Sequence, residues 1–138
     1  MKWTAHENIA VRHCLAPKSQ SGAAIHYGTG VLRTNFQEAL IILSLGTMAA
    51  SSTYDVKVQE SDDDSTYTDV TSAAFAQKVA ATHASKTFVG RLNLIGRKKY
   101  IRIAGTDAVG AVLSCGIIVL VSPKVRPVTL EQTIGFNV

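Results

Sequence analysis

The chain has 138 residues, of which 46% are apolar and 7% aromatic, and its 14 Lys and Arg against 10 Asp and Glu give a net charge of +4. This length predicts one domain with a core of Val, Ile, Leu and Ala that needs no disulfide or metal. The charge excess is too small to indicate a nucleic-acid-binding protein. Because polar and charged residues occur throughout residues 1–15 and the apolar stretch 108–121 is short, we expect a soluble protein without a signal peptide or membrane-spanning helix.

The first 22 residues have only scattered apolar positions, which indicates an extended N-terminal arm with one short strand at most. Strand candidates follow at 24–33, 38–45, 53–60, 66–70, 88–95, 100–104 and 109–121. Glycine-containing breaks separate them, at 28–30, 46, 96–99 and 105–107. Seven or eight short antiparallel strands predict an all-β fold, a β-sandwich or jelly roll, over residues 23–121, with a C-terminal arm over 122–138.

Residues 72–85 fit two interpretations. They are rich in Ala and Gln, and their length allows a helix of about three turns. Their apolar stripe is weak and strands flank them, so a loop with a short helix or strand fits equally well.

The stretch 54–70 predicts a surface β-hairpin. Tyr54, Val56 and Val58 fall on one face of a strand of period two, and the residues between them are polar. Residues 61–65, Ser-Asp-Asp-Asp-Ser, tolerate turn geometry and bond to their own backbone before a second short strand begins.

The aspartates at this turn also suggest a calcium site, because Ca²⁺ prefers several carboxylate oxygens. The spacing departs from an EF-hand loop that begins at Asp62. Tyr67 stands where that loop needs glycine, and Ala73 where it needs a bidentate glutamate. An acidic turn is the simpler interpretation.

No pattern of catalytic or cofactor-binding residues is present. The four histidines, His6, His13, His26 and His83, lack the spacing of metal ligands. There is no Gly-x-Ser-x-Gly motif, and the sequence at 28–30 lacks the third glycine and the βαβ context of a dinucleotide site. We therefore expect neither an enzyme nor a bound metal or cofactor.

The densest basic cluster lies at 97–102 and holds one aromatic residue, Tyr100. A surface for single-stranded nucleic acid needs more aromatic stacking platforms. Since Ile101 and Ile103 alternate with polar neighbours, the cluster predicts the exposed basic face of a strand. Cys115 lies in an apolar run and predicts a buried small side chain, while a disulfide to Cys14 stays open, with reduced thiols the expectation.

Two stretches, 40–45 and 109–121, are apolar on both faces of a strand. This surplus predicts either burial on both sides within the domain or a second face covered by another subunit, and the second explanation suits a small chain because in a sandwich only one face of each sheet is buried. The C-terminal stretch 125–138 alternates apolar and polar residues at intervals. It suits an arm that reaches onto a neighbour and, equally, a tail that folds back over its own domain.

The motifs of the central part of the chain resemble a known class of proteins. Val56 to Val70 contain Val-x-Glu-Ser-Asp-Asp followed by Ser-Thr-Tyr-Thr-Asp-Val, and Lys98 to Ile103 read Lys-Lys-Tyr-Ile-Arg-Ile. With the apolar strand after them, they resemble small β-sandwich structural proteins of tailed bacteriophages, most of all capsid decoration or cement proteins. The resemblance covers roughly the central half of the chain and does not reach its ends.

The resemblance implies a protein made in the bacterial cytoplasm that binds the outer surface of the phage head and bridges subunits of the major capsid protein. We expect a dimer or trimer, with no nucleic-acid or membrane partner. From the physics of arms, contacts with the shell are expected at Trp3, Arg12, Arg126, Leu130, Ile134 and Phe136. Two alternatives remain: a tail or fibre module that binds carbohydrate or a receptor through Tyr54, Tyr67 and the aspartates at 62–64, and a head-to-tail connector or tail-completion protein.

Overall fold

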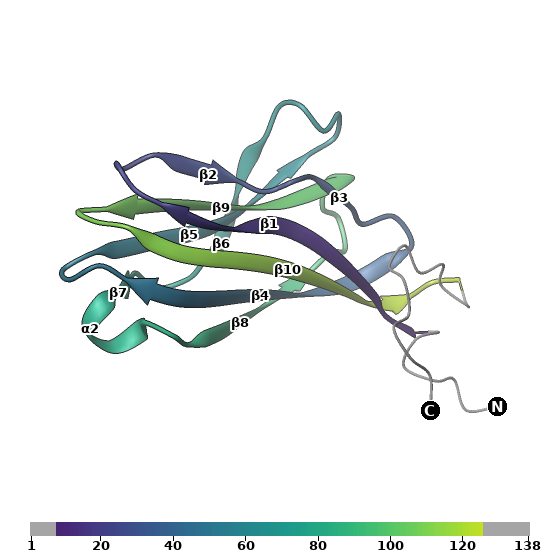
Figure 1. Cartoon of the computed structure of the whole chain (residues 1–138). Helices are drawn as coiled ribbons and strands as arrows, with labels where there is room; N and C mark the ends of the chain where they lie inside the picture. The colour runs from purple at the N-terminus through teal and green to yellow at the C-terminus, as the bar shows by residue number, and fades with distance from the viewer. Residues whose placement is uncertain (1–7, 126–138) are drawn as a thin grey trace.

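The computed structural model describes residues 8–125, and these fold into two antiparallel β-sheets packed face to face (Figure 1). The four-stranded sheet has the order β1-β10-β4-β8, and the six-stranded sheet the order β2-β9-β5-β6, with β3 paired to β9 and β7 to β5. The elements are β1 (Ala10–Gln20), β2 (Ile25–Tyr27), β3 (Val31–Leu32), β4 (Phe36–Met48), β5 (Thr53–Ser61), β6 (Thr68–Ala74), β7 (Lys78–Val79), α2 (Ala80–His83), β8 (Thr87–Asn93), β9 (Tyr100–Ala108) and β10 (Val112–Pro123). The predicted all-β sandwich is confirmed.

The core lies between the sheets and consists of small and medium aliphatic side chains. Ile41, Leu43 and Ile118 point inward from the four-stranded sheet, and Ile101 and Ile103 point inward from the six-stranded sheet, each at most 2% exposed. Alternate residues of each strand meet this layer, as expected of two sheets packed face to face.

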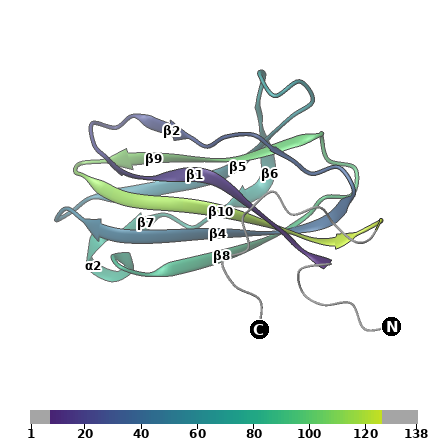
Figure 2. The same cartoon turned by 45° about the vertical axis from the view of Figure 1, so that its right-hand side comes forward.

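The predicted hairpin is confirmed. β5 and β6 pair antiparallel, with Gln59 opposite Asp69, and the turn between them projects beyond the body of the sandwich (Figures 1 and 2). Tyr54, Val56 and Val58 face the core, as their alternation predicted.

The predicted N-terminal arm, 1–22, is too long. Residues 10–20 form β1, which pairs with β10 from Ala10 opposite Leu120 to Gln20 opposite Val112. Ala10, Cys14 and Leu15 are buried, but β-bulges between His13 and Lys18 disturb the alternation that identifies a strand. The sandwich therefore begins before residue 23, and β10 continues two residues past the predicted boundary at 121.

The predicted turn at 105–107 is wrong, because Gly105 lies inside β9 opposite Val56. A Cβ at this position would overlap the ring of Tyr54, so the glycine makes room for a side chain. The chain reverses instead after Ala108, where Val109 has a φ of 73°.

Of the two interpretations of residues 72–85, the structure supports the loop with a short helix and a short strand over the helix of three turns. β6 runs to Ala74, and β7 and the four-residue α2 follow. The cysteines are free. Cys14 is buried, whereas Cys115, which was predicted to be buried, is half-exposed on the outer side of β10. The reason is the register of β10, in which Ser114 and Gly116 take the inward positions.

Candidate docking face

The outer surface of the four-stranded sheet is apolar. Along β4 and β10 the residues between the buried ones are themselves mostly apolar, and β1 and β8 continue the same rows at each side. In one row Val11 lies beside Val119, Val119 beside Leu40, and Leu40 beside Arg91. We call this surface the apolar face, and it comprises Val11, Leu40, Ile42, Val89, Leu113, Cys115, Ile117, Val119 and Val121.

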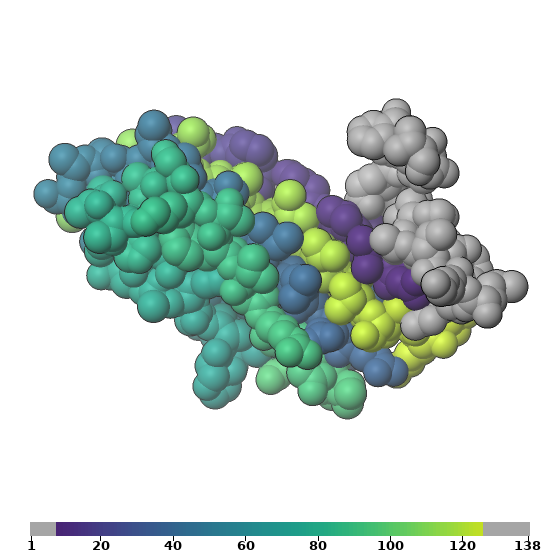
Figure 3. Space-filling view, turned by 90° about the horizontal axis from the view of Figure 1, so that it is seen from below, coloured from purple at the N-terminus to yellow at the C-terminus, as the bar shows by residue number. Residues whose placement is uncertain are grey.

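The apolar face is open in the described part of the chain. Its side chains are half-exposed or exposed, and the two most exposed are Val89 at 61% and Leu113 at 39%. Figure 3 shows this side of the molecule, where the strands follow one another in the order β8, β4, β10 and β1, from teal-green through blue and yellow-green to purple.

The outer surface of the six-stranded sheet is mixed: Ile25, Tyr27 and Leu32 on β2 and β3 are 46–49% exposed there, whereas β5 and β6 carry polar side chains that contact one another. Asp69 accepts hydrogen bonds from Lys57 Nζ and Gln59 Nε2, both at 2.7 Å. Gln59 Oε1 in turn accepts a hydrogen bond from Arg102 Nε at 3.0 Å. Among the described residues, the four-stranded sheet is therefore the one whose central strands carry continuous rows of apolar side chains on the outer surface.

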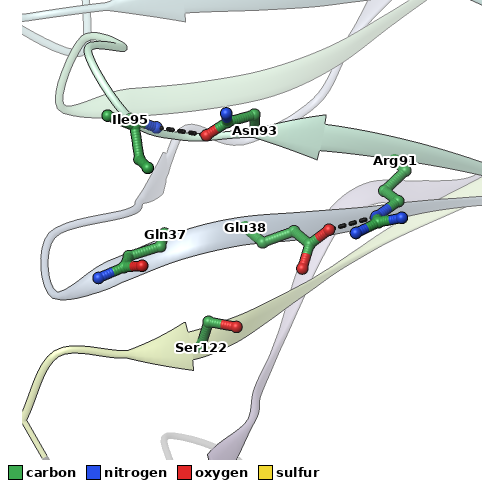
Figure 4. Close-up of a pocket in the computed structure, with 6 residues that line it drawn as sticks. All are labelled: Gln37, Glu38, Arg91, Asn93, Ile95 and Ser122. Atoms are coloured by element: carbon green, nitrogen blue, oxygen red, sulfur yellow. Dashed lines mark hydrogen bonds and ion pairs between the residues drawn. The ribbon is translucent and has the colours of Figure 1, made fainter.

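A polar pocket of about 420 Å³ lies at the end of the apolar face where β8 and β10 finish (Figure 4). Glu38 on β4 and Arg91 on β8 form an ion pair across its wall. Asn93 Oδ1 accepts a hydrogen bond from the backbone N–H of Ile95 at 2.9 Å. An apolar centre with a polar margin is the anatomy of a protein–protein interface.

Covering the apolar face would yield a useful binding energy. Fully burying a Val, Leu or Ile side chain that starts in water contributes about 1.5–3 kcal/mol, and a partly buried one contributes in proportion to its exposed fraction. The eight aliphatic side chains of the face, six of them exposed by about a third at most, therefore supply at most roughly 5–9 kcal/mol, against an association cost of about 4–15 kcal/mol. The two ranges overlap, so the apolar face suits binding to a partner that is fixed in a larger assembly better than a very tight complex between two proteins free in solution.

Of the residues predicted to contact a partner, Arg12 is the one that the structure describes. It lies on β1 opposite Ile118, is half-buried, and donates a hydrogen bond from Nη1 to the backbone carbonyl of Val11 at 3.2 Å. Trp3, Arg126, Leu130, Ile134 and Phe136 lie outside the described residues. The sequence indicated surplus apolar surface at 40–45 and 109–121, but it did not identify Val11 and Val89 as part of it.

The acidic turn is held together by its own hydrogen bonds. Asp63 Oδ1 accepts bonds from Ser61 Oγ at 2.7 Å, Thr66 N at 2.9 Å and Ser65 N at 3.0 Å. These bonds hold the pKa of the Asp63 carboxyl well below its usual range. Asp64 accepts a hydrogen bond from the hydroxyl of Tyr67. The carboxylates thus close the turn, as the simpler interpretation predicted, instead of converging on one point.

Arg102 connects this hairpin to the neighbouring strand. Its guanidinium lies between two aromatic rings, with its carbon 4.2 Å from the centroid of Tyr27 and 3.8 Å from that of Tyr67. Stacking of a cation on both faces is favourable and fixes the hairpin against β2. The basic exposed strand face predicted at 100–103 is therefore engaged with aromatic side chains of the same chain.

Within residues 8–125, no group of three or more His, Cys, Asp and Glu side chains lies close enough to hold a metal ion. The described residues also contain no helix long and apolar enough to cross a membrane.

No protein-family model matches the chain, and no curated protein matches its sequence. Among solved structures, the fold is similar to that of the PBSX exported protein XepA, with a TM-score of 0.58 at 12% sequence identity. The similarity covers 93% of this chain and 42% of that protein, so the chain spans less than half the length of its structural neighbour. At this identity the comparison establishes a shared β-sandwich fold.

Proposed function

We propose that the protein is a structural component of a tailed-phage particle that docks through its apolar face. In its specific form the proposal is a capsid decoration, or cement, protein on the outer surface of the head. It would bridge neighbouring subunits of the major capsid protein and bury apolar strand surface that neither partner buries alone. This role requires no catalytic residue, metal or cofactor.

The observation that carries the proposal is the apolar face itself. A sheet with one side in the core and a second apolar side is partnered in the working state, because exposed apolar patches of this kind mark interaction sites. The motifs at 56–70 and 98–103, which resemble phage virion proteins, support the phage context. The fold neighbour, a phage PBSX protein, supports it as well.

The copy number of the chain in purified phage particles tests this role. Quantitative mass spectrometry against the major capsid protein should give a ratio near one or a simple fraction of it. A few copies per particle would move the assignment to a connector or tail-completion protein. Complete absence from the particle would refute the virion role.

A pair of variants tests the docking face. Ile42→Lys places a charge at the centre of the apolar face, and Thr106→Lys places the same charge on the outer surface of the six-stranded sheet. Both positions are half-exposed strand positions that point outward. In a sedimentation assay with particles that lack the protein, Ile42→Lys should lose binding at least tenfold, since a desolvated unpaired charge costs over 1.4 kcal/mol. Thr106→Lys should bind like the wild type; equal binding by both variants would exclude the apolar face.

The receptor-binding alternative has less support. It relied on Tyr54 as an exposed aromatic residue beside Tyr67 and the aspartates, whereas Tyr54 is fully buried and its hydroxyl bonds to Ser114 Oγ at 2.9 Å. The other aromatic residue of that group, Tyr67, has Arg102 stacked on its ring, so at most one face of the ring can contact a ligand.

A further inference from the structure

β8 is an edge strand, and one side of its backbone has no ladder partner in the described chain. It pairs with β4 alone, from Thr87 opposite Ser44 to Asn93 opposite Glu38. An unpaired edge presents a row of N–H and C=O groups that can pair with another chain.

Two hydrogen bonds at the ends of β8 show which groups face outward. Leu94 N donates to Gln37 O at 2.8 Å, and Leu45 N donates to Lys86 O at 2.9 Å. In both bonds the residue on the side of β8, Leu94 or Lys86, has an even number. Along an antiparallel strand, alternate residues direct their N–H and C=O groups to the same neighbour, so the even-numbered residues of β8 bond to β4. The backbone groups of Val89 and Arg91 therefore point away from β4 toward the open edge.

The open edge lacks the usual protection against pairing. Residues 87–93 contain no Pro or Lys, and their one charged side chain, Arg91, is paired with Glu38. Beside the edge, a groove of about 330 Å³ between β8 and the end of β6 is lined largely by apolar residues, including Val89, Leu92 and Phe75. A strand that added to β8 would also cover this groove.

The sequence of β8 fits a second copy of itself. Antiparallel pairing about a two-fold axis at Gly90 sets Val89 opposite Arg91 of the other copy, Phe88 opposite Leu92, and Thr87 opposite Asn93. No like charges lie directly opposite each other, and the two Arg91 side chains, which are diagonal neighbours, are each paired with Glu38 of their own chain. The two Gly90 residues form a non-hydrogen-bonded pair on the axis, where Cα atoms approach to about 4.5 Å. Glycine suits that position, because a Cβ there would already lie 3.1 Å from Phe75 Cζ.

We infer that two copies of the chain pair through β8 into one continuous eight-stranded sheet. The two apolar faces then join into a single surface of twice the area. This inference extends the proposed docking role and names its partner at the edge, a second copy. Dimerisation is measured without any phage particle, so its failure is separate from failure of the virion role.

Size-exclusion chromatography with light scattering tests the pairing over about 1–100 μM, a range that spans weak interfaces. The wild type should approach twice its chain mass of 14.7 kDa as the concentration rises. Val89→Pro removes an N–H that faces the open edge and leaves the β4 ladder intact, so it should remain monomeric. Val89→Ala removes the side chain but keeps the N–H, and it should still dimerise.

A wild type that is monomeric throughout the range would overturn the inference, as would a dimer that survives Val89→Pro. If both variants are monomeric, side-chain packing and not the β8 ladder joins the copies, which also overturns it. If Val89→Pro fails to fold, hydrogen exchange of the wild type decides. The amides of Val89 and Arg91 should become slower to exchange as the dimer forms, and exchange that is independent of concentration refutes the pairing.

Discussion

Gly105 can be explained in two ways: as a residue that a turn requires, which the sequence suggested, or as a residue that makes room for the ring of Tyr54. The substitution Gly105→Ala distinguishes them. In the structure this residue lies in β9, and a Cβ would come within 3.0 Å of three atoms at the hydroxyl end of Tyr54. The backbone of Gly105 is not in the left-handed region, so alanine adds no conformational strain of its own. Any loss of stability must come from the displaced ring.

The expected loss follows from two effects. Overpacking in a core costs about 1–3 kcal/mol. Moving the ring also breaks the buried hydrogen bond between Tyr54 Oη and Ser114 Oγ, which costs about 1–3 kcal/mol when a partner is left unsatisfied. We therefore expect Gly105→Ala to lower the free energy of unfolding by about 2–6 kcal/mol, a large part of the 5–15 kcal/mol typical of a domain.

Urea unfolding of a double-mutant cycle measures this effect. In a Tyr54→Leu background the added methyl group has space, so Gly105→Ala should cost less than about 1 kcal/mol there. Gly46→Ala is the matched control, because its Cβ would lie 2.7 Å from Cδ2 of Leu113, the end of an exposed side chain that can move away. A cost below about 0.5 kcal/mol for Gly105→Ala, or an equal cost in both backgrounds, would refute the steric explanation.

Two further predictions concern single side chains. Burial raises the pKa of the Cys14 thiol to about 11. In the native state at pH 8, Cys14 should therefore resist alkylation while the half-exposed Cys115 reacts. Mass spectrometry measures the labelling of each cysteine, and equal labelling would contradict this prediction. Since this pKa is raised on folding from 9.0, its contribution to stability is present below pH 9 and is lost as the pH rises toward 11, a loss that Cys14→Ala should abolish. Arg102→Ala removes a cation stacked on the partly exposed rings of Tyr27 and Tyr67, and it should destabilise the protein by about 1–2 kcal/mol in thermal unfolding. Arg102→Lys, which keeps the charge, should recover about half of this loss. No change in stability would mean that the stack does not hold the hairpin.

Much of the fold could be predicted because period-two alternation is a local property. The strands around Tyr54, Val58, Ile101 and Ile103 show it clearly, and each of these residues faces the core. The hairpin turn was equally local, since its aspartates and serines bond to the backbone beside them. β1 escaped prediction because its bulges break the alternation, and β7 is too short to show a period.

The apolar face was predictable from the sequence only in part. That β4 and β10 carry apolar residues on both sides was predictable, since it follows from consecutive aliphatic residues such as Leu40 to Leu43. Only the tertiary structure decided that these strands are neighbours, that Val11 and Val89 extend their rows, and that β8 ends the sheet with an open edge. Strand order and register depend on pairing between residues far apart in the chain, and no local pattern encodes which distant strand becomes the neighbour.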